Sequence, residues 1–248
     1  MIRLVPLAVA ARIEPGAELA ALLVAAVTAA GERLQDGDVL VVAQKPVSKA
    51  EGRIVELADV EPSAEALAIA AEDGGDPRVV EVILRESVAV VRRRGSFIIG
   101  RTAQGHVCGS AGVDRSNQNA PDQVTLLPVD PDASARLLRG ALLALTGAAV
   151  AIVISDSFGR PFRRGTVGVA IGAAGFVSVV EHAGRLDDAG RALQATRVHM
   201  ADQLASAAEL ALGPYGGVPA VLIRGVDLEA GDEGASAGVI EPALDLFA

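Results

Sequence analysis

The sequence AAVAIVISDSFGRPFRRGTVGVAIG, residues 148–172, joins an apolar run to a polar turn and a second apolar run. Its first part, residues 148–154, is rich in Val and Ile and too short for a pair of helices, which predicts a buried strand. A Ser-Asp-Ser triplet at 155–157 closes that strand, and the chain turns at Gly159. A second apolar run, dotted with glycines, begins at Gly165.

Three arginines follow the end of this strand, at Arg160, Arg163 and Arg164. Hard cations prefer oxygen ligands such as the carboxylate and hydroxyls of residues 155–157. Phosphates bind cations and bidentate guanidinium donors. The stretch therefore indicates a metal or phosphate site at a strand end. A solvated turn with an ordinary ion pair is the alternative explanation.

The composition indicates a large aliphatic core and an acidic surface. Of 248 residues, 51% are hydrophobic and only 2% aromatic, so Ala, Val, Leu and Ile must fill the core. This length corresponds to one large domain or two small ones. The net charge of −9 argues against a nucleic-acid-binding surface, because that function needs a basic face. A local arginine cluster remains compatible with one small anionic ligand.

The single cysteine, Cys108, excludes an internal disulfide and a cysteine-only metal site. It fits a reducing compartment, and we expect it to be a small buried hydrophobe rather than a nucleophile. Residues 1–12 make a poor signal peptide, and residues 141–154 fall short of the roughly 20 apolar residues of a membrane span. We therefore expect a cytoplasmic protein that contacts no membrane.

Strand and helix signals are mixed without strict alternation, which favours an α+β fold, or an irregular α/β fold, with mixed sheets and flanking helices. Strands are predicted at residues 2–10, 39–43, 88–92, 96–100, 148–154, 176–180 and 219–224. Helices are predicted at residues 18–30, 62–72, 77–86, from a cap at Asp132 or Ser134 to about Leu145, and 196–212. The acidic, glycine-rich segment 227–238 is expected to be mobile.

Polar residues follow the short apolar strand predicted at residues 39–43. Gln44, Lys45 and Lys49 come directly after it, at the position where α/β folds place ligands. The two lysines are the first cations available to an anion. Ordinary surface lysines are the alternative interpretation.

The segment 105–122 has few signals of regular structure and is dense in small and polar residues. Long irregular loops inside compact chains are often functional. Asp114 and Asn117 are its candidate oxygen ligands, with an Asx-turn and a helix cap as their structural alternatives. The sequence contains neither a P-loop motif nor G-x-G-x-x-G, so no standard nucleotide motif explains these residues.

Several stretches, taken together and in this order, match a known pattern: VSKAEGRIV (47–55), CGSAGVDRSN (108–117), LLPVDPDASARLLR (126–139), SDSFGRPFRRGTVGVAIG (155–172) and ADQLASAAEL (201–210). They resemble the coenzyme F-420-0:L-glutamate ligases, the gamma-glutamyl ligases of deazaflavin coenzyme biosynthesis. The resemblance implies one free-standing ligase domain over residues 1–248, without a fused reductase domain. It also implies two intertwined subdomains and a butterfly-like homodimer.

The resemblance further implies a GTP-dependent amide ligase with two divalent cations, Mg²⁺ or Mn²⁺, and K⁺ as a further candidate. GTP would phosphorylate a carboxylate of the deazaflavin precursor, and the amine of L-glutamate would attack the acyl phosphate. A carboxylate is a poor acyl donor until its oxygen becomes part of a phosphate leaving group. Phosphoryl transfer between anions needs charge neutralisation, which metals and arginines supply.

Position by position, the resemblance assigns roles to particular residues. Metal binding falls to Asp114, Asp156 and Ser157. Catalytic positions near the reacting phosphates or the substrate fall to Asp156, Arg160 and Arg164. Nucleotide binding falls to Gln44, Lys49, Asn117, Gly213 and Tyr215.

The chain departs from the family pattern at three places. Residues 10–13 replace a Leu-Pro-Glu-like segment, and Gln44 replaces a serine. Pro214 stands in a loop that normally supplies a side-chain metal ligand. Three possibilities stay open: a glutamate ligase for the deazaflavin coenzyme, a ligase for another carboxylate acceptor, and a nucleotide-binding homologue without catalysis.

Overall fold

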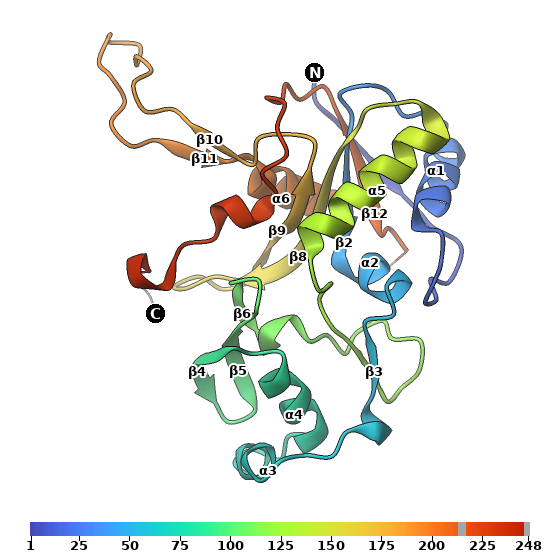
Figure 1. Ribbon diagram of the computed structural model, residues 1–248, viewed down its shortest axis with the longest axis vertical. Coiled ribbons are helices and arrows are strands. Elements are labelled where there is room, and N and C mark those ends of the chain that lie inside the picture. The colour runs from blue at the N-terminus through green and yellow to red at the C-terminus, as the bar shows by residue number, and fades with distance from the viewer. Residues whose placement is uncertain (213–216, 246–248) are drawn as a thin grey trace.

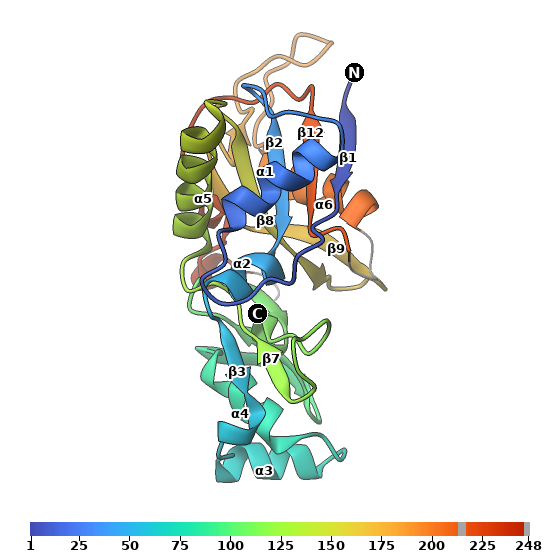
Figure 2. The same ribbon diagram turned by 90° about the vertical axis from the view of Figure 1, so that its right-hand side faces the viewer.

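The structure is a computed structural model that describes residues 1–212 and 217–245. Two parts follow one another along its long axis (Figures 1 and 2). A mixed sheet flanked by helices forms the larger part, and the chain from β3 (Ile54–Glu56) to β7 (Gln123–Thr125) forms the smaller one. The predicted α+β class with mixed sheets and flanking helices is confirmed.

Residues 148–172 supply β8 and most of β9, the fourth strand and an edge strand of the main sheet, whose strand order is β1-β12-β2-β8-β9. β8 (Ala151–Gly159) pairs in parallel with β2 (Val39–Ala43) and antiparallel with β9 (Thr166–Ala174). On the other side, β12 (Ala220–Arg224) pairs antiparallel with both β2 and β1 (Arg3–Leu7). The carboxyl ends of the parallel pair β2 and β8 therefore open on the same edge.

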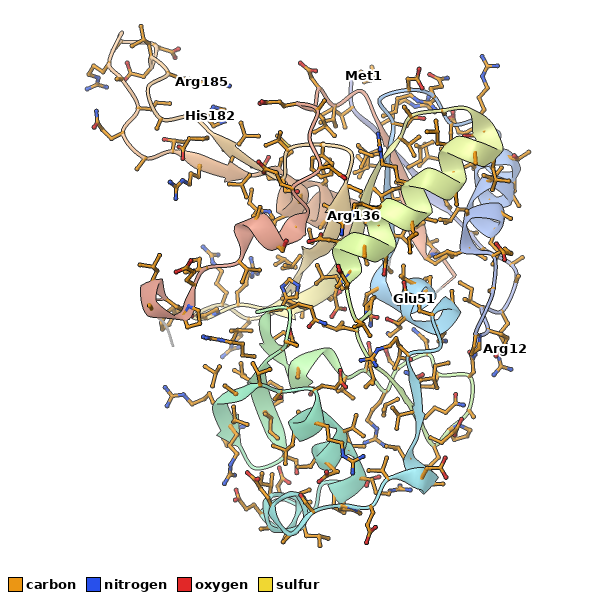
Figure 3. All side chains as sticks on the ribbon, in the orientation of Figure 1. Met1, Arg12, Glu51, Arg136, His182 and Arg185 are labelled. Carbon is orange, nitrogen blue, oxygen red and sulfur yellow. The ribbon has the colours of Figure 1, made fainter. Side chains whose placement is uncertain are left out.

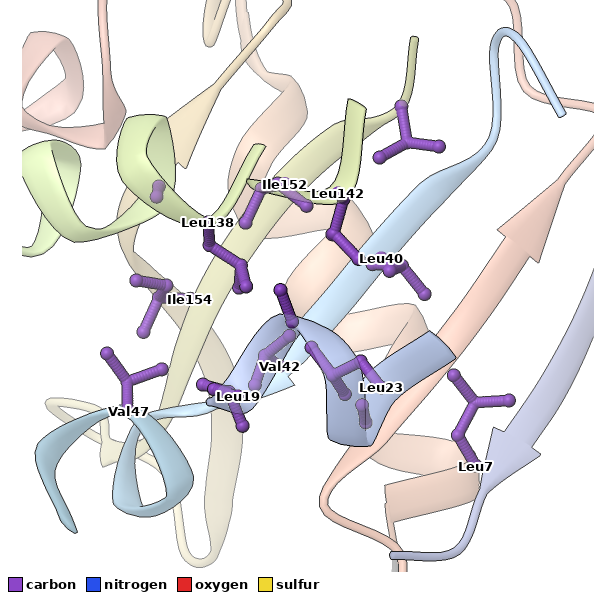
Figure 4. Close-up of a cluster of buried hydrophobic side chains, with 14 of the residues drawn as sticks. Leu7, Leu19, Leu23, Leu40, Val42, Val47, Leu138, Leu142, Ile152 and Ile154 are labelled. Atoms are coloured by element: carbon purple, nitrogen blue, oxygen red, sulfur yellow. The ribbon is translucent and has the colours of Figure 1, made fainter. Parts of the chain in front are cut away.

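Alternate residues of a strand point to opposite faces of the sheet. Because the central strands are apolar on both faces, helices cover both faces. Leu40 and Val42 pack with α1 and α5 in the cluster of Figure 4, whereas Val39 and Val41 pack with α6. A short helix follows β2 directly. The bounds of the helices are α1 Leu19–Ala29, α2 Gln44–Ala50, α5 Pro131–Thr146 and α6 Met200–Leu212.

The smaller part has a core of its own around Leu57, Ile83 and Ile98. Its strands β4, β5 and β6 form one antiparallel sheet, and β3 pairs with β7. The bounds are η1 Leu57–Asp59, α3 Ala64–Ala71, α4 Pro77–Arg85, β4 Ala89–Arg94, β5 Phe97–Arg101, β6 Val107–Gly109 and η2 Ser110–Gly112.

Two glycines in β9 allow helices to approach this strand closely. A Cβ at Gly168 would lie 2.5 Å from the carbonyl oxygen of Ala205 in α6. A Cβ at Gly172 would lie 2.3 Å from the carbonyl oxygen of Pro131 in α5. The glycine-dotted run thus fixes how tightly both helices pack on the strand beside the candidate site.

Two sequence-predicted elements differ from the structure because strand pairing overrides local signals. β8 continues through the Ser-Asp-Ser triplet to Gly159, since β9 supplies partners such as Val169 opposite Asp156. The helix predicted from residue 196 begins at Met200. The preceding residues form β11 (Arg197–His199), which pairs with β10 (Val179–Glu181).

The predicted cap of α5 at Asp132 or Ser134 is wrong. Asp130 caps the helix: its side chain accepts the backbone N–H of Ala133 at 2.8 Å. Asp132 is buried and instead accepts the N–H groups of Ala173 and Ala235, at 2.8 and 2.7 Å. This carboxylate packs the end of the segment predicted to be mobile against the main sheet.

The remaining elements lie at the periphery. The β10–β11 hairpin projects from the main sheet, with His182 and Arg185 along its outer part (Figure 3). Two 3-10 turns, η3 (Ala235–Gly238) and η4 (Pro242–Leu244), close the described chain. None of the helices within residues 1–212 and 217–245 has the length and apolarity to cross a membrane.

Candidate active site

A cleft of about 700 Å³ opens where the carboxyl ends of β2 and β8 face the smaller part of the molecule. Ligands of open α/β sheets bind at this kind of position. Its walls bring together residues from distant parts of the chain, among them Arg12, Gln44, Lys45, Lys49, Asp114, Asn117, Asn119, Asp156, Ser157 and Glu209. Arg12 lies on the loop that follows β1, at the side of the molecule in Figure 3.

Asp114 is held in place by its own loop and by α2. Its Oδ1 accepts the backbone N–H of Ser116 at 2.6 Å, so the Asx-turn predicted as its structural alternative is confirmed. Its Oδ2 lies 2.7 Å from Nζ of Lys45, which also donates to the hydroxyl of Ser116 at 2.6 Å. The carboxylate is thus oriented into the cleft by a turn and neutralised by an ammonium group.

Asp156 points into the same cleft from β8 and lies in a different electrostatic setting. Burial, the largest cause, together with the negative charges of Asp114 and Glu209 raises the pKa of its carboxyl to about 6. The Lys45 ammonium and the backbone N–H of Ser157 act in the opposite direction. Asp114 and Asp156 are far apart in the sequence. In the folded chain, the charge of Asp114 acts on the Asp156 carboxyl.

Asp114, Asp156 and Glu209 form an acidic wall of the cleft, and the Ser157 hydroxyl belongs to the same lining. The Ser157 hydroxyl donates to Oε1 of Glu209 at 2.8 Å, which links β8 to the last turns of α6. Sequence reasoning missed Glu209. The only signal was its position in the stretch at 201–210, on the helix side that does not enter the core.

These oxygen atoms fit a hard divalent cation. Carboxylate and hydroxyl oxygens are the ligands that Mg²⁺ and Ca²⁺ prefer, and Mg²⁺ uses one or two carboxylates together with waters and substrate phosphates. Within the described residues, no three His, Cys, Asp or Glu side chains already form a metal cage. A cation here would therefore share Asp114 and Asp156 with hydroxyl, water and ligand oxygens.

Cationic side chains form a second part of the cleft lining, the cationic wall of Lys45, Lys49 and Arg12. Lys49 donates to the carbonyl of Asn117 at 2.6 Å and to Oδ1 of Asn119 at 3.1 Å. Burial lowers the pKa of the Lys49 ammonium, and the nearby charges of Lys45 and Arg12 lower it further. Arg12 donates to the carbonyl of Asn119. The cleft of this acidic protein thus presents a local positive wall suited to a polyphosphate.

Gln44 lies at the start of α2 and is buried. Its Oε1 accepts the hydroxyl of Ser48 at 2.7 Å, so the amide group is oriented by a neighbour one turn away. Its Nε2 has no hydrogen-bond partner among the described residues. An amide N–H donor is therefore left over at the base of the cleft.

The other predicted site residues lie elsewhere. Arg160 and Arg164 are exposed in the turn between β8 and β9, outside the residues that line the cleft. Gly213 and Tyr215, together with Pro214, lie outside the described residues.

Cys108 is buried as expected, and burial raises the pKa of its thiol to about 12, which makes it a poor nucleophile.

Comparison with known proteins places residues 9–225 on the family model described as F420-0:gamma-glutamyl ligase. A coenzyme F420:L-glutamate ligase of Methanothermobacter thermautotrophicus is 47% identical over 211 residues, covering 85% of this chain and 83% of that relative. A coenzyme F420:L-glutamate ligase of Methanopyrus kandleri is 45% identical over 251 residues, covering 99% and 97%. One from Methanocaldococcus jannaschii is 41% identical over 84% of this chain and 83% of its own.

Proposed function

Because the chain belongs to the F420-0:gamma-glutamyl ligase family, we propose that it joins L-glutamate to coenzyme F420-0 through an amide bond. The curated relatives are named as ligases of coenzyme F420 and L-glutamate. The observation that carries the proposal is the cleft itself. It brings an acidic wall of Asp114, Asp156 and Glu209 and a cationic wall of Lys45, Lys49 and Arg12 together in one cleft, where Lys45 contacts Asp114 directly.

The proposed reaction uses GTP to activate a carboxylate. A carboxylate oxygen of F420-0 attacks the γ-phosphorus of GTP, the bond to the β-phosphate oxygen breaks, and GDP leaves. The amine of L-glutamate then attacks the acyl carbon, the carbon–oxygen bond to phosphate breaks, and an amide and inorganic phosphate form. The amine protons pass to water.

The acidic wall would hold divalent cations, Mg²⁺ or Mn²⁺. Asp114 and Asp156 would hold the first, and the second would lie at Ser157, where Glu209 accepts the hydroxyl. When bound, these cations would supply positive charge to the phosphate oxygens during transfer. Asp156 fits this role because its half-buried carboxylate lies near two other acids and gains from a cation.

The cationic wall would bind the nucleotide. Lys49 is positioned by Asn117 and Asn119, which fixes its ammonium at the edge of the cleft. Gln44 would supply its free N–H₂ donor to a ligand oxygen after a small side-chain movement. The assignments of Gly213 and Tyr215 to nucleotide binding stay predictions.

We also keep the homodimer and the cytoplasmic location as parts of the proposal. Arg160 and Arg164 lie in an exposed turn, so a role near the reacting phosphates requires that the turn moves or that a second copy brings its turn to the cleft. A dimer would give these arginines a role without movement of their own turn.

A ligase for a different carboxylate acceptor is the second candidate. It is favoured by the buried Gln44, which stands where the family pattern has a serine and has an unpartnered donor.

GDP release in the presence of Mn²⁺, GTP, L-glutamate and F420-0 tests the first candidate. Release that requires both F420-0 and L-glutamate, and that is lost in Asp156→Ala, supports it. Turnover only with another acceptor in the same assay supports the second.

A further inference from the structure

Lys45 occupies the position on Asp114 that a metal ion would need. Its Nζ lies 2.7 Å from Oδ2, while Oδ1 already accepts the N–H of Ser116. The hydroxyl of Ser116 accepts a second hydrogen bond from the ammonium at 2.6 Å. Both carboxylate oxygens of Asp114 are therefore engaged, and Oδ2 has a positive charge in contact with it.

An ammonium group and a divalent cation cannot share this place at low cost. Both charges are positive, and the side chains of Lys45 and Asp114 are only 22% and 29% exposed, so water screens them incompletely. Repulsion between the two positive charges therefore favours withdrawal of Lys45 when a divalent cation coordinates Oδ2.

The freed ammonium has a destination in the same cleft. Lys45 carries its charge on a flexible stem and stands one helical turn before Lys49 in α2. Both lysines line the cleft. Phosphate oxygens of a nucleotide against the cationic wall would accept the donors that Asp114 gives up.

We infer that Lys45 is a positioning residue that exchanges partners: it neutralises Asp114 in the metal-free protein and binds the nucleotide phosphates once a divalent cation takes its place. The inference rests on the proposed function, because it assumes the metal site at Asp114 and a phosphate ligand. Its consequence is positive coupling: the nucleotide stabilises the withdrawn lysine, so it strengthens metal binding, and the metal strengthens nucleotide binding by the same factor.

The test measures Mn²⁺ binding by calorimetry to the wild-type protein, Lys45→Met and Lys45→Arg, with Mn²⁺ alone and with a non-hydrolysable GTP analogue. Lys45→Met should bind Mn²⁺ alone about fivefold more tightly or better, because the competing charge is gone, and the analogue should enhance its Mn²⁺ binding less. Lys45→Arg, which keeps the charge, should show no such gain. If Lys45 only fastens the loop of Asp114 to α2, Lys45→Met should bind Mn²⁺ more weakly, which would overturn the inference.

A second measurement needs no variant. Reductive methylation of the wild-type protein, read by peptide mass spectrometry, should modify Lys45 faster in Mn²⁺ than in EDTA, and the GTP analogue should then protect it. Normal Mn²⁺ binding with no change at Lys45 would overturn this inference alone. Absence of any Mn²⁺ binding would instead overturn the metal dependence of the proposed function, and the inference with it.

Discussion

The hydroxyl of Ser157 donates to the carboxylate of Glu209 at 2.8 Å, which ties the edge of the central strand pair to α6. Glu209 also raises the pKa of the neighbouring Asp156 carboxyl, so it belongs to the same electrostatic unit. The acidic wall thus has a member from α6, a helix that the metal-binding assignments did not include. Glu209 thus adds a carboxylate to the described part of the cleft.

Glu209→Gln should lower activity by about 10- to 100-fold, the usual effect of removing a group that supports a metal site. The amide still accepts the Ser157 hydroxyl, so the substitution removes charge and keeps shape. Steady-state GDP release across a Mn²⁺ titration is the measurement. Gln203→Glu, at an exposed position of the same helix, is the matched control and should leave the rate unchanged. Wild-type Mn²⁺ dependence in Glu209→Gln would exclude Glu209 from the site.

Asp156→Asn should stabilise the metal-free protein at high pH. The pKa of this carboxyl is raised to about 6 in the folded state, above its unfolded value. The ionised group therefore destabilises the fold fully above pH 6, and the penalty disappears as the pH falls toward 4. We expect Asp156→Asn to gain roughly 1–3 kcal/mol at pH 8 in EDTA and almost nothing at pH 4.

Urea unfolding at both pH values checks this prediction. Asp114→Asn is the natural comparison, because that carboxylate is already neutralised by Lys45. Loss of this partly exposed ion pair should cost up to about 1 kcal/mol at pH 8. Equal effects of the two substitutions would contradict the different settings described for the two acids.

Arg164→Ala should inactivate the enzyme if the turn between β8 and β9 acts at the reacting phosphates. Should a second copy supply that turn, mixing inactive Arg164→Ala with inactive Asp156→Asn should restore about a quarter of wild-type activity, because half of the sites lie in mixed dimers and half of those are intact. Light scattering supplies the mass, and mass spectrometry verifies subunit exchange. No recovery after verified exchange would place the turn in the cleft of its own chain or outside catalysis.

Asp132→Ala should destabilise the fold more than Asp130→Ala. Asp130 is a helix cap whose loss costs about 1 kcal/mol. Asp132 is buried and accepts backbone N–H groups from β9 and η3, so its loss leaves several buried donors unpaired and should cost about 2–4 kcal/mol. Thermal unfolding of the two variants compares them. A larger loss for Asp130→Ala would reverse the roles read from the structure.

Sequence reasoning predicted the strands that build the site and most of its polar residues. The apolar runs that precede Gln44 and the Ser-Asp-Ser triplet form the parallel pair β2 and β8. Parallel neighbours place their carboxyl ends at the same edge of the sheet. Asp114, Asp156 and Lys49 accordingly line one cleft. The helix cap was missed although Pro131 at the first helical position points to Asp130.

Other features depended on packing that no local pattern encodes. Glu209 meets Ser157 only because α6 lies on β9 at Gly168, a contact between segments that are far apart in the chain. α6 begins four residues later than predicted, at Met200, because residues 197–199 pair with β10 as a strand. Lys45 could not be told from a surface lysine until its distance to Asp114 was known.

We propose that the protein joins L-glutamate to coenzyme F420-0 in this cleft with the help of Asp114 and Asp156. Mass spectrometry of F420-0 after incubation with the protein, L-glutamate, GTP and Mn²⁺ tests it most directly. The wild-type protein should form a product heavier by glutamyl residues, and this product should be absent with EDTA or with Asp156→Ala. Unchanged F420-0 after incubation with folded, Mn²⁺-loaded protein would contradict it.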